Sequence, residues 1–198
     1  MSHERGNSML EVLVVASIVA IVAGITVPNL LVARQRADLD ALARRVLADT
    51  VRCRFQALNR KANVGLVFAR DRAGYYYDTV EDGDHDGVSR RDFARGVDRR
   101  LSPTVPFDRL CIGASLGVPI NWRVPDPSGR GWLPCGDGLR AGRSDIISFT
   151  PLGDATPATL YLTDGRDRLL AVRVYGGTAR IRVLEWRVGW RRWRTASL

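Results

Sequence analysis

Residues 12–33 read VLVVASIVAIVAGITVPNLLVA, and none of them carries a charge. At about 1.5 Å per residue this stretch is about 33 Å long as a helix, enough to cross a hydrocarbon core of about 30 Å. A secretory signal peptide has a shorter apolar region, with positive charge before it and a small-residue cleavage site after it. Here Glu4 and Glu11 offset Arg5 and the amino terminus, so the stretch predicts a single membrane-spanning helix.

An acidic residue, Glu11, lies at the N-terminal edge of this stretch, where a carboxylate near hydrocarbon needs a cationic partner. The dipeptide Arg5-Gly6 lies just upstream. If the chain were cut after Gly6, the new α-amino group of Asn7 would lie four residues before Glu11. These two groups can pair within one helix or between neighbouring helices, and such a pair would set the register of an assembly.

The dipeptide Arg5-Gly6 and residues 7–15, NSMLEVLVV, resemble the class III signal of the type IV pilin superfamily, with Asn7 where phenylalanine is usual. Pro28 lies where pilins commonly carry a helix-bending proline. The resemblance implies cleavage between Gly6 and Asn7 by prepilin peptidase and N-methylation of Asn7. It also implies assembly with other pilin-like subunits through Glu11 and Pro28.

The orientation of the span follows from the same resemblance, which implies a single-pass protein of the inner membrane with its C-terminal domain in the periplasm. The charges around the span do not favour this orientation by themselves, because Arg34 and Arg36 follow it directly. Asp38 and Asp40 dilute that positive charge.

Apolar residues continue at helical spacing after the span, in one stripe and in a second stripe beside it. The first stripe contains Leu39, Leu42, Val46, Cys53 and Ala57, and the second contains Leu47, Val51, Phe55 and Leu58. Because the periodicity resumes beyond Pro28, this proline is predicted to bend the helix rather than to end it. We therefore expect one helix from about Met9 to Arg60, half in lipid and half packed on a domain.

Short β-type runs separated by Gly-, Pro- and Asp-rich joints follow from Ala62 onward. Residues 64–69 and 75–80 predict a hairpin, and the later candidate strands are 121–124, 145–150, 158–163, 169–175 and 179–186. The predicted fold class is α+β and pilin-like, with a long N-terminal helix packed against an antiparallel β-sheet domain. The predicted segments are a leader peptide (1–6), a transmembrane and assembly segment (7–33), an amphipathic half-helix (34–61) and a periplasmic β-rich domain (62–198) with an insertion around 81–101.

Two C-terminal runs are similar to the GspH/FimT family within that superfamily. Ile147-Ser148-Phe149-Thr150-Pro151-Leu152-Gly153, followed by residues 158–162, resembles its I-x-F-x-P-x-G run and the next strand. Residues 178–183 resemble its closing strand, with alanine where glycine is common. This resemblance implies a minor pseudopilin of a type II secretion system, which joins other pseudopilins in a filament for protein export. The alternative is a FimT-type minor pilin of a type IV pilus.

Residues 82–87, DGDHDG, open like an EF-hand calcium loop, with three carboxylates at alternate positions. Asp82, Asp84 and Asp86 are therefore candidate Ca²⁺ ligands, and Asp92 is a candidate to close a shortened loop. Two alternatives stay open: an acidic solvated loop without metal, and a capping box of Ser89 with Asp92 that starts a small helix over 90–101.

The C-terminal tail alternates arginine with tryptophan, a combination that binds nucleic acid through phosphates and stacked bases. Arg180, Arg182, Arg187 and Arg191 are the candidate DNA contacts. Packing of the tryptophans on the domain itself or on a neighbouring subunit is the other interpretation. The net charge of +9 is weak support for DNA, because Lys61 is the only lysine among 30 basic residues and the arginines follow a general composition bias.

The three cysteines predict neither a metal site nor redox chemistry, because none has a CxxC partner. Cys111 and Cys135 flank a loop-rich stretch and are candidates for a disulfide in an oxidising periplasm, which leaves Cys53 as a buried apolar residue. Catalysis is not expected, because His3 and His85 lie far from any plausible nucleophile and no phosphate loop is present.

Overall fold

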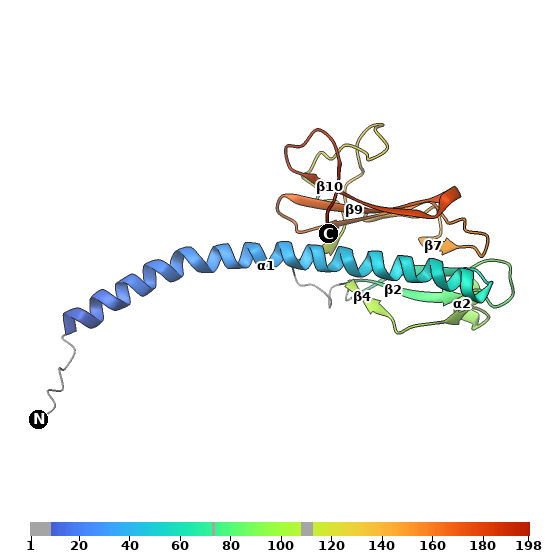
Figure 1. Cartoon of the computed structure of the whole chain (residues 1–198), viewed down its shortest axis with the longest axis horizontal. Helices are drawn as coiled ribbons and strands as arrows, with labels where there is room; N and C mark the ends of the chain where they lie inside the picture. The colour runs from blue at the N-terminus through green and yellow to red at the C-terminus, as the bar shows by residue number, and fades with distance from the viewer. Residues whose placement is uncertain (1–8, 73, 108–112) are drawn as a thin grey trace, which may run out of the picture.

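The computed structural model describes residues 9–72, 74–107 and 113–198. A single helix, α1 (Met9–Arg60), matches the predicted bounds and runs through Pro28 without a break. In Figure 1 the helix curves over its N-terminal part, and the folded domain surrounds only its C-terminal half. The predicted α+β architecture with a long N-terminal helix is confirmed.

The strands of the described residues form two antiparallel sheets rather than the one sheet predicted. The first contains β1 (Val64–Asp71), β2 (Gly74–Glu81), β3 (Arg99–Arg100), β4 (Val105–Pro106) and β7 (Ile146–Phe149). The second contains β5 (Ser115–Leu116), β6 (Leu139–Arg140), β8 (Ala158–Thr163), β9 (Arg168–Tyr175), β10 (Arg180–Arg187) and β11 (Arg194–Thr195). Two short helices, α2 (Arg90–Arg95) and the 3₁₀ turn η1 (Gly176–Thr178), complete the described elements.

The two sheets lie on different sides of α1. Figure 1 shows β9 and β10 above the helix and β2 and β4 below it. The chain changes sheet after β4, after β6 and again after β7, where Gly153 in the turn to β8 has a φ of 92° that favours glycine. The helix therefore supplies the core to which both sheets pack.

The first predicted stripe of α1 is the centre of that core, since Leu39, Leu42 and Cys53 are completely buried. The second stripe differs from the prediction. Phe55 remains 58% exposed and Leu58 40% exposed, because the two sheets leave this side of α1 uncovered. The helix thus buries a narrower face than its sequence suggests.

Two further predictions about local structure were wrong. Residues 121–124 form no strand but part of a loop, in which Trp122 N–H donates to the carbonyl of Pro119 at 3.1 Å. Prolines on both sides restrict pairing there, because proline has no N–H for a ladder. The helix predicted over 90–101 ends at Arg95, because Gly96 adopts the left-handed conformation that caps it.

Candidate assembly and interaction sites

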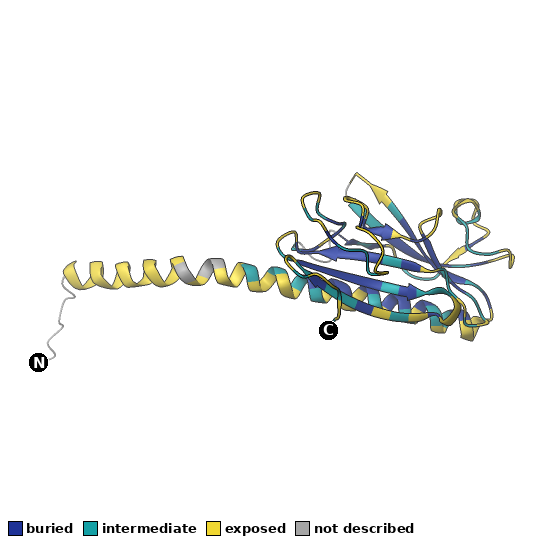
Figure 2. Ribbon diagram, turned by 90° about the horizontal axis from the view of Figure 1, so that it is seen from above, coloured by how far each residue is buried: buried dark blue, intermediate teal, exposed yellow. Residues whose placement is uncertain are grey.

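The N-terminal half of α1 exposes a continuous apolar surface. Met9 is 92% exposed, Leu13 68% and Ile21 65%. Figure 2 shows this half in yellow up to the point where the domain begins. Among the described residues, α1 is the helix that is long and apolar enough to cross a membrane. So much exposed apolar surface is stable only against lipid or other helices.

The acidic residue of this surface, Glu11, is exposed in the first turn of α1, where the helix dipole favours a negative charge. Within the described ranges, no ion pair includes Glu11. The proposed partner, the amino group of Asn7, lies outside the described residues, as does Gly6. The backbone of Pro28 is helical, within α1.

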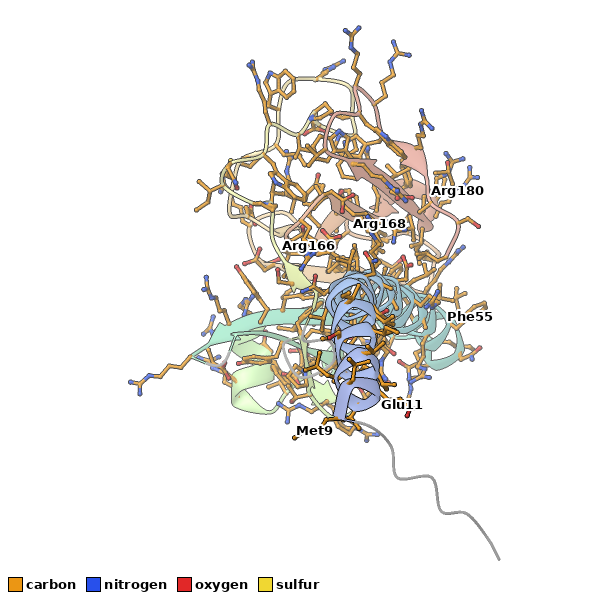
Figure 3. The ribbon with its side chains drawn as sticks, turned by 90° about the vertical axis from the view of Figure 1, so that its left-hand side faces the viewer. Met9, Glu11, Phe55, Arg166, Arg168 and Arg180 are labelled. Atoms are coloured by element: carbon orange, nitrogen blue, oxygen red, sulfur yellow. The ribbon has the colours of Figure 1, made fainter. Side chains whose placement is uncertain are left out.

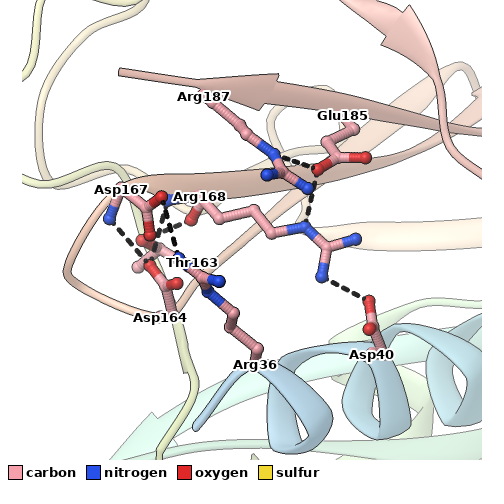
Figure 4. Close-up of polar contacts among 8 residues, drawn as sticks. All are labelled: Arg36, Asp40, Thr163, Asp164, Asp167, Arg168, Glu185 and Arg187. Atoms are coloured by element: carbon pink, nitrogen blue, oxygen red, sulfur yellow. Dashed lines mark hydrogen bonds and ion pairs between the residues drawn. The ribbon is translucent and has the colours of Figure 1, made fainter. Parts of the chain in front are cut away.

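A polar network joins α1 to the second sheet where the packed half of the helix begins (Figure 4). Arg168, at the start of β9, is nearly buried, and its guanidinium contacts Asp40 of α1 and Glu185 of β10, each at 2.7 Å. Arg187 donates to the same oxygen of Glu185 at 2.7 Å. One arginine therefore ties the helix to two adjacent strands.

Hydrogen bonds to the backbone of Arg168 hold the turn that precedes it. The Asp164 carboxylate accepts a hydrogen bond from the Arg168 backbone N–H at 3.1 Å, and Thr163 Oγ1 donates to the Arg168 carbonyl at 3.2 Å. Asp167, in the same turn, pairs with Arg36 of α1 at 3.5 Å. These contacts attach the turn between β8 and β9 to α1 just beyond the predicted span.

The electrostatics of this network favour its charged form. Burial alone would raise the pKa of Glu185, but hydrogen bonds from Arg187 and Arg168 outweigh it and lower the pKa. For Arg168, burial alone would lower the pKa, whereas Glu185 and Asp40 together raise it. Glu185 and Arg168 therefore both remain ionised at neutral pH.

A second buried contact joins α1 to the first sheet. The Tyr77 hydroxyl of β2 donates to the Asp49 carboxylate of α1 at 2.6 Å, and Arg45 donates to the same oxygen at 2.7 Å. Burial is the main cause that raises the pKa of Tyr77, and the neighbouring Asp49 carboxylate raises it further. The phenol therefore stays protonated and donates. Neither polar contact is predicted from the sequence, because the partners are far apart in the chain and no local motif marks them.

The acidic loop brings Asp82, Asp84 and Asp86 together, with one carboxylate oxygen of each within 4.8 Å of the others. The buried Asp82 carboxylate accepts hydrogen bonds from the N–H groups of His85 at 2.8 Å and Gly87 at 2.9 Å. A hydrogen bond with Asp84 and the charge of Asp84 raise the pKa of the exposed Asp86 carboxyl. Oxygen atoms in this arrangement suit a hard cation such as Ca²⁺.

Asp92 is used as a helix cap. Its backbone N–H donates to Ser89 Oγ at 3.1 Å, and its carboxylate accepts from that hydroxyl at 2.5 Å. The capping interpretation is thus confirmed for the start of α2. Asp98, which no local motif marks, closes the loop by accepting hydrogen bonds from the N–H groups of Gly83 and Ser89 at 3.2 and 3.0 Å.

The four arginines of the predicted DNA edge do not form one surface. Arg180 and Arg182 are exposed near the start of β10, on the side of the sheet away from α1, and Arg182 lies directly opposite Arg173 of β9. Arg187 ends the same strand and is paired with Glu185 on the side that faces α1. Arg191 lies beyond it, at the opposite end of β10 from Arg180. Strand alternation places Arg187 on the opposite side of the sheet from Arg180 and Arg182, and the length of β10 separates Arg191 from Arg180.

The cysteines leave the disulfide prediction untested. Cys135 is exposed, and its thiol donates to the carbonyl of Ile120 at 3.2 Å, whereas Cys111 lies outside the described residues. Cys53 is buried in α1 as predicted, and burial raises the pKa of its thiol, which keeps it unreactive.

Comparison with known proteins identifies relatives of both the N-terminal segment and the chain as a whole. Residues 1–27 match the family described as the prokaryotic N-terminal methylation motif. The chain is 30% identical over 184 residues to the pilin-like protein PilA1 of Thermus thermophilus, a match that covers 89% of this chain and 97% of that protein. No solved structure matches the chain.

Proposed function

This chain belongs to the type IV pilin superfamily, and from that membership we propose that it is a minor pseudopilin of a type II secretion system. It is inserted in the inner membrane as a single-pass protein, with its C-terminal domain in the periplasm. Prepilin peptidase cleaves between Gly6 and Asn7 and methylates Asn7. The mature subunit then joins other pseudopilins in a periplasmic filament that helps to export proteins.

The observation that carries this proposal is the apolar, uncovered half of α1 with Glu11 in its first turn. Before assembly this surface is covered by lipid, and in a filament it is covered by the same helix of neighbouring subunits. A carboxylate in such a core needs a cation, and the α-amino group of Asn7 on a neighbouring helix supplies one. The secretion role itself rests on the resemblance of residues 147–153 and 178–183 to the GspH group.

The test of processing and assembly uses the full chain co-expressed with prepilin peptidase and the other subunits. Mass spectrometry is expected to find a chain that begins at N-methylated Asn7. Glu11→Ala should leave cleavage intact and remove the subunit from purified filaments, whereas Glu4→Ala, in the leader, should change nothing. An uncleaved chain, or normal incorporation of the Glu11→Ala variant, would contradict the proposal.

One observation favours a second function, that of a pilus minor pilin that binds DNA. Arg173, Arg180 and Arg182 lie on one exposed side of β9 and β10, and no carboxylate pairs with them among the described residues. Like charges directly opposite each other in a sheet are unfavourable unless an anion binds. The Arg180→Ala, Arg182→Ala double variant should then lose a salt-dependent DNA affinity that an Arg91→Ala, Arg95→Ala control keeps. Absence of any gel retardation of the unmodified chain at low salt would leave only the secretion role.

We also propose that Ca²⁺ is the cation of the acidic loop, held by Asp82, Asp84 and Asp86. The convergence of their oxygens and the raised pKa of the Asp86 carboxyl beside Asp84 support it. A bound cation would relieve the repulsion among these carboxylates and order the segment that leads to α2. Its role is structural.

A further inference from the structure

The tryptophans of the chain all lie at one end of the folded domain. The five residues are Trp122, Trp132, Trp186, Trp190 and Trp193, so α1 contains none. Two of the indole N–H groups are used internally, since Trp186 donates to the Trp190 carbonyl at 2.8 Å and Trp193 to the Pro125 carbonyl at 2.6 Å. The first bond holds the loop of residues 188–193 on the end of β10, and the second fixes that loop against the loop of residues 118–135.

Between these two loops lies an apolar cleft of about 480 Å³, which Trp122, Trp132, Val188 and Trp190 line. Large apolar side chains are exposed in and beside it. Trp132 is 55% exposed, Val188 53%, and Ile120, in the adjoining loop segment, 84%. We call this surface the aromatic end and define it as residues 120–123, 132 and 188–192. It is an exposed apolar patch that no other part of the domain covers among the described residues.

Arginines surround the aromatic end. Arg123 lies over the Trp132 ring at 4.3 Å, and Arg194 lies over the Trp190 ring at the same distance. Arg191 lines the cleft, and Arg192 beside it is exposed. Within residues 9–72, 74–107 and 113–198, none of these four guanidinium groups has a carboxylate partner. The patch is therefore both apolar and strongly cationic.

The aromatic end is linked to the part of α1 that lies just beyond the predicted span. The Val188 N–H donates to the Asp167 carbonyl at 2.9 Å, and the Asp167 carboxylate pairs with Arg36 of α1 at 3.5 Å. Arg36 is three residues beyond the predicted span, which is about 5 Å along a helix. The headgroup layer on each side of a bilayer is about 5–8 Å thick. Figure 3, which looks along α1 from the end that carries Met9 and Glu11, shows Arg166 and Arg168 above the helix, on the side of the second sheet.

We propose that the aromatic end docks on the headgroup layer of an anionic phospholipid membrane, the same membrane that holds the apolar half of α1. Indole rings favour the boundary between hydrocarbon and water, and guanidinium groups bind the phosphates of lipid headgroups. The continuity of this surface with the span through Arg36 identifies the occupant as lipid rather than a soluble ligand. Docking fixes the tilt of the domain before assembly and must be broken when the subunit enters a filament. The inference rests on the membrane insertion included in the proposed function.

Tryptophan fluorescence tests this proposal directly, because all five indoles belong to the domain. The full chain is reconstituted in vesicles that contain a phosphatidylcholine with a nitroxide on its headgroup, with or without phosphatidylglycerol. We expect the nitroxide to quench about half of the emission in the anionic vesicles and much less in the neutral ones. An Arg123→Gln, Arg191→Gln, Arg192→Gln variant should give the neutral-lipid value in both. The matched control is Arg91→Gln, Arg95→Gln, Arg99→Gln, in and shortly after α2, which Figure 1 shows at the far end of the domain, and it should behave as the unmodified chain.

Flotation of the same vesicles separates the two proposals. A chain that floats but shows no quenching, or equal quenching in both lipids, would overturn the docking and leave membrane insertion standing. A chain that does not float would overturn both. If emission becomes shielded from a soluble quencher only when other subunits are added, the occupant is a protein and the docking on lipid is wrong.

Discussion

The replacement of Arg168 by methionine tests the network that joins α1 to the second sheet. The Arg168 side chain is 9% exposed, its partner Glu185 13% and its partner Asp40 27%. Removal of one member of a fully buried ion pair costs about 3–5 kcal/mol, because a charge is left without a partner. Here water reaches Asp40, and Glu185 keeps Arg187, so we expect a loss of about 2 kcal/mol in the free energy of unfolding.

Urea unfolding of the full chain in detergent, followed by tryptophan emission, measures this loss, because the five indoles report on the domain alone. The matched control is Arg166→Met, two residues away and exposed, which should change the free energy of unfolding by no more than about 0.5 kcal/mol. The Asp40→Asn change should cost less in the Arg168→Met background than in the unmodified chain, since it then removes an unpaired charge. Equal effects of Arg168→Met and Arg166→Met, or strict additivity with Asp40→Asn, would refute the reasoning.

Three further outcomes follow from the contacts described above. Because the pKa of Glu185 is lowered in the folded state, its contribution to stability is present above its ordinary pKa of about 4.5 and lost as the pH falls through the lower folded value. Stability curves at pH 3 to 7 should therefore show a decline at the acidic end (roughly below pH 4.5) that is smaller in a Glu185→Gln variant. Tyr77→Phe should lower the free energy of unfolding by about 1–2 kcal/mol, because it leaves the buried Asp49 carboxylate without one donor. The control Tyr76→Phe should leave the free energy of unfolding unchanged, and equal losses for the two variants in urea unfolding would contradict this. Ca²⁺ should raise the melting temperature by a few degrees, and Asp84→Asn should remove that shift. If calorimetry shows that Ca²⁺ does not change the melting temperature of the unmodified chain, the cation is excluded from the loop.

Local sequence determined the elements whose signals are complete within a short window. The charge-free run of residues 12–33 requires a helix long enough for a membrane, and the spacing of Leu39, Leu42 and Val46 carries that helix on into the domain. The hairpin of β1 and β2 followed in the same way, because two consecutive strands adjoin one short turn, and so did the cap at Ser89, whose partner Asp92 is three residues away.

Tertiary structure alone decided which of the candidate side chains share a surface. The division into two sheets on different sides of α1 leaves Phe55 exposed, although its spacing is as helical as that of Leu42. The strand direction of β10 separates Arg180 from Arg191, and the loops bring Trp132 and Trp190 into one cleft. The contact of Arg168 with Asp40 joins residues more than a hundred positions apart. The physical reason is that helical and strand periodicities express nearest-neighbour geometry, whereas ion pairs and apolar clefts depend on distances that only the packed chain defines.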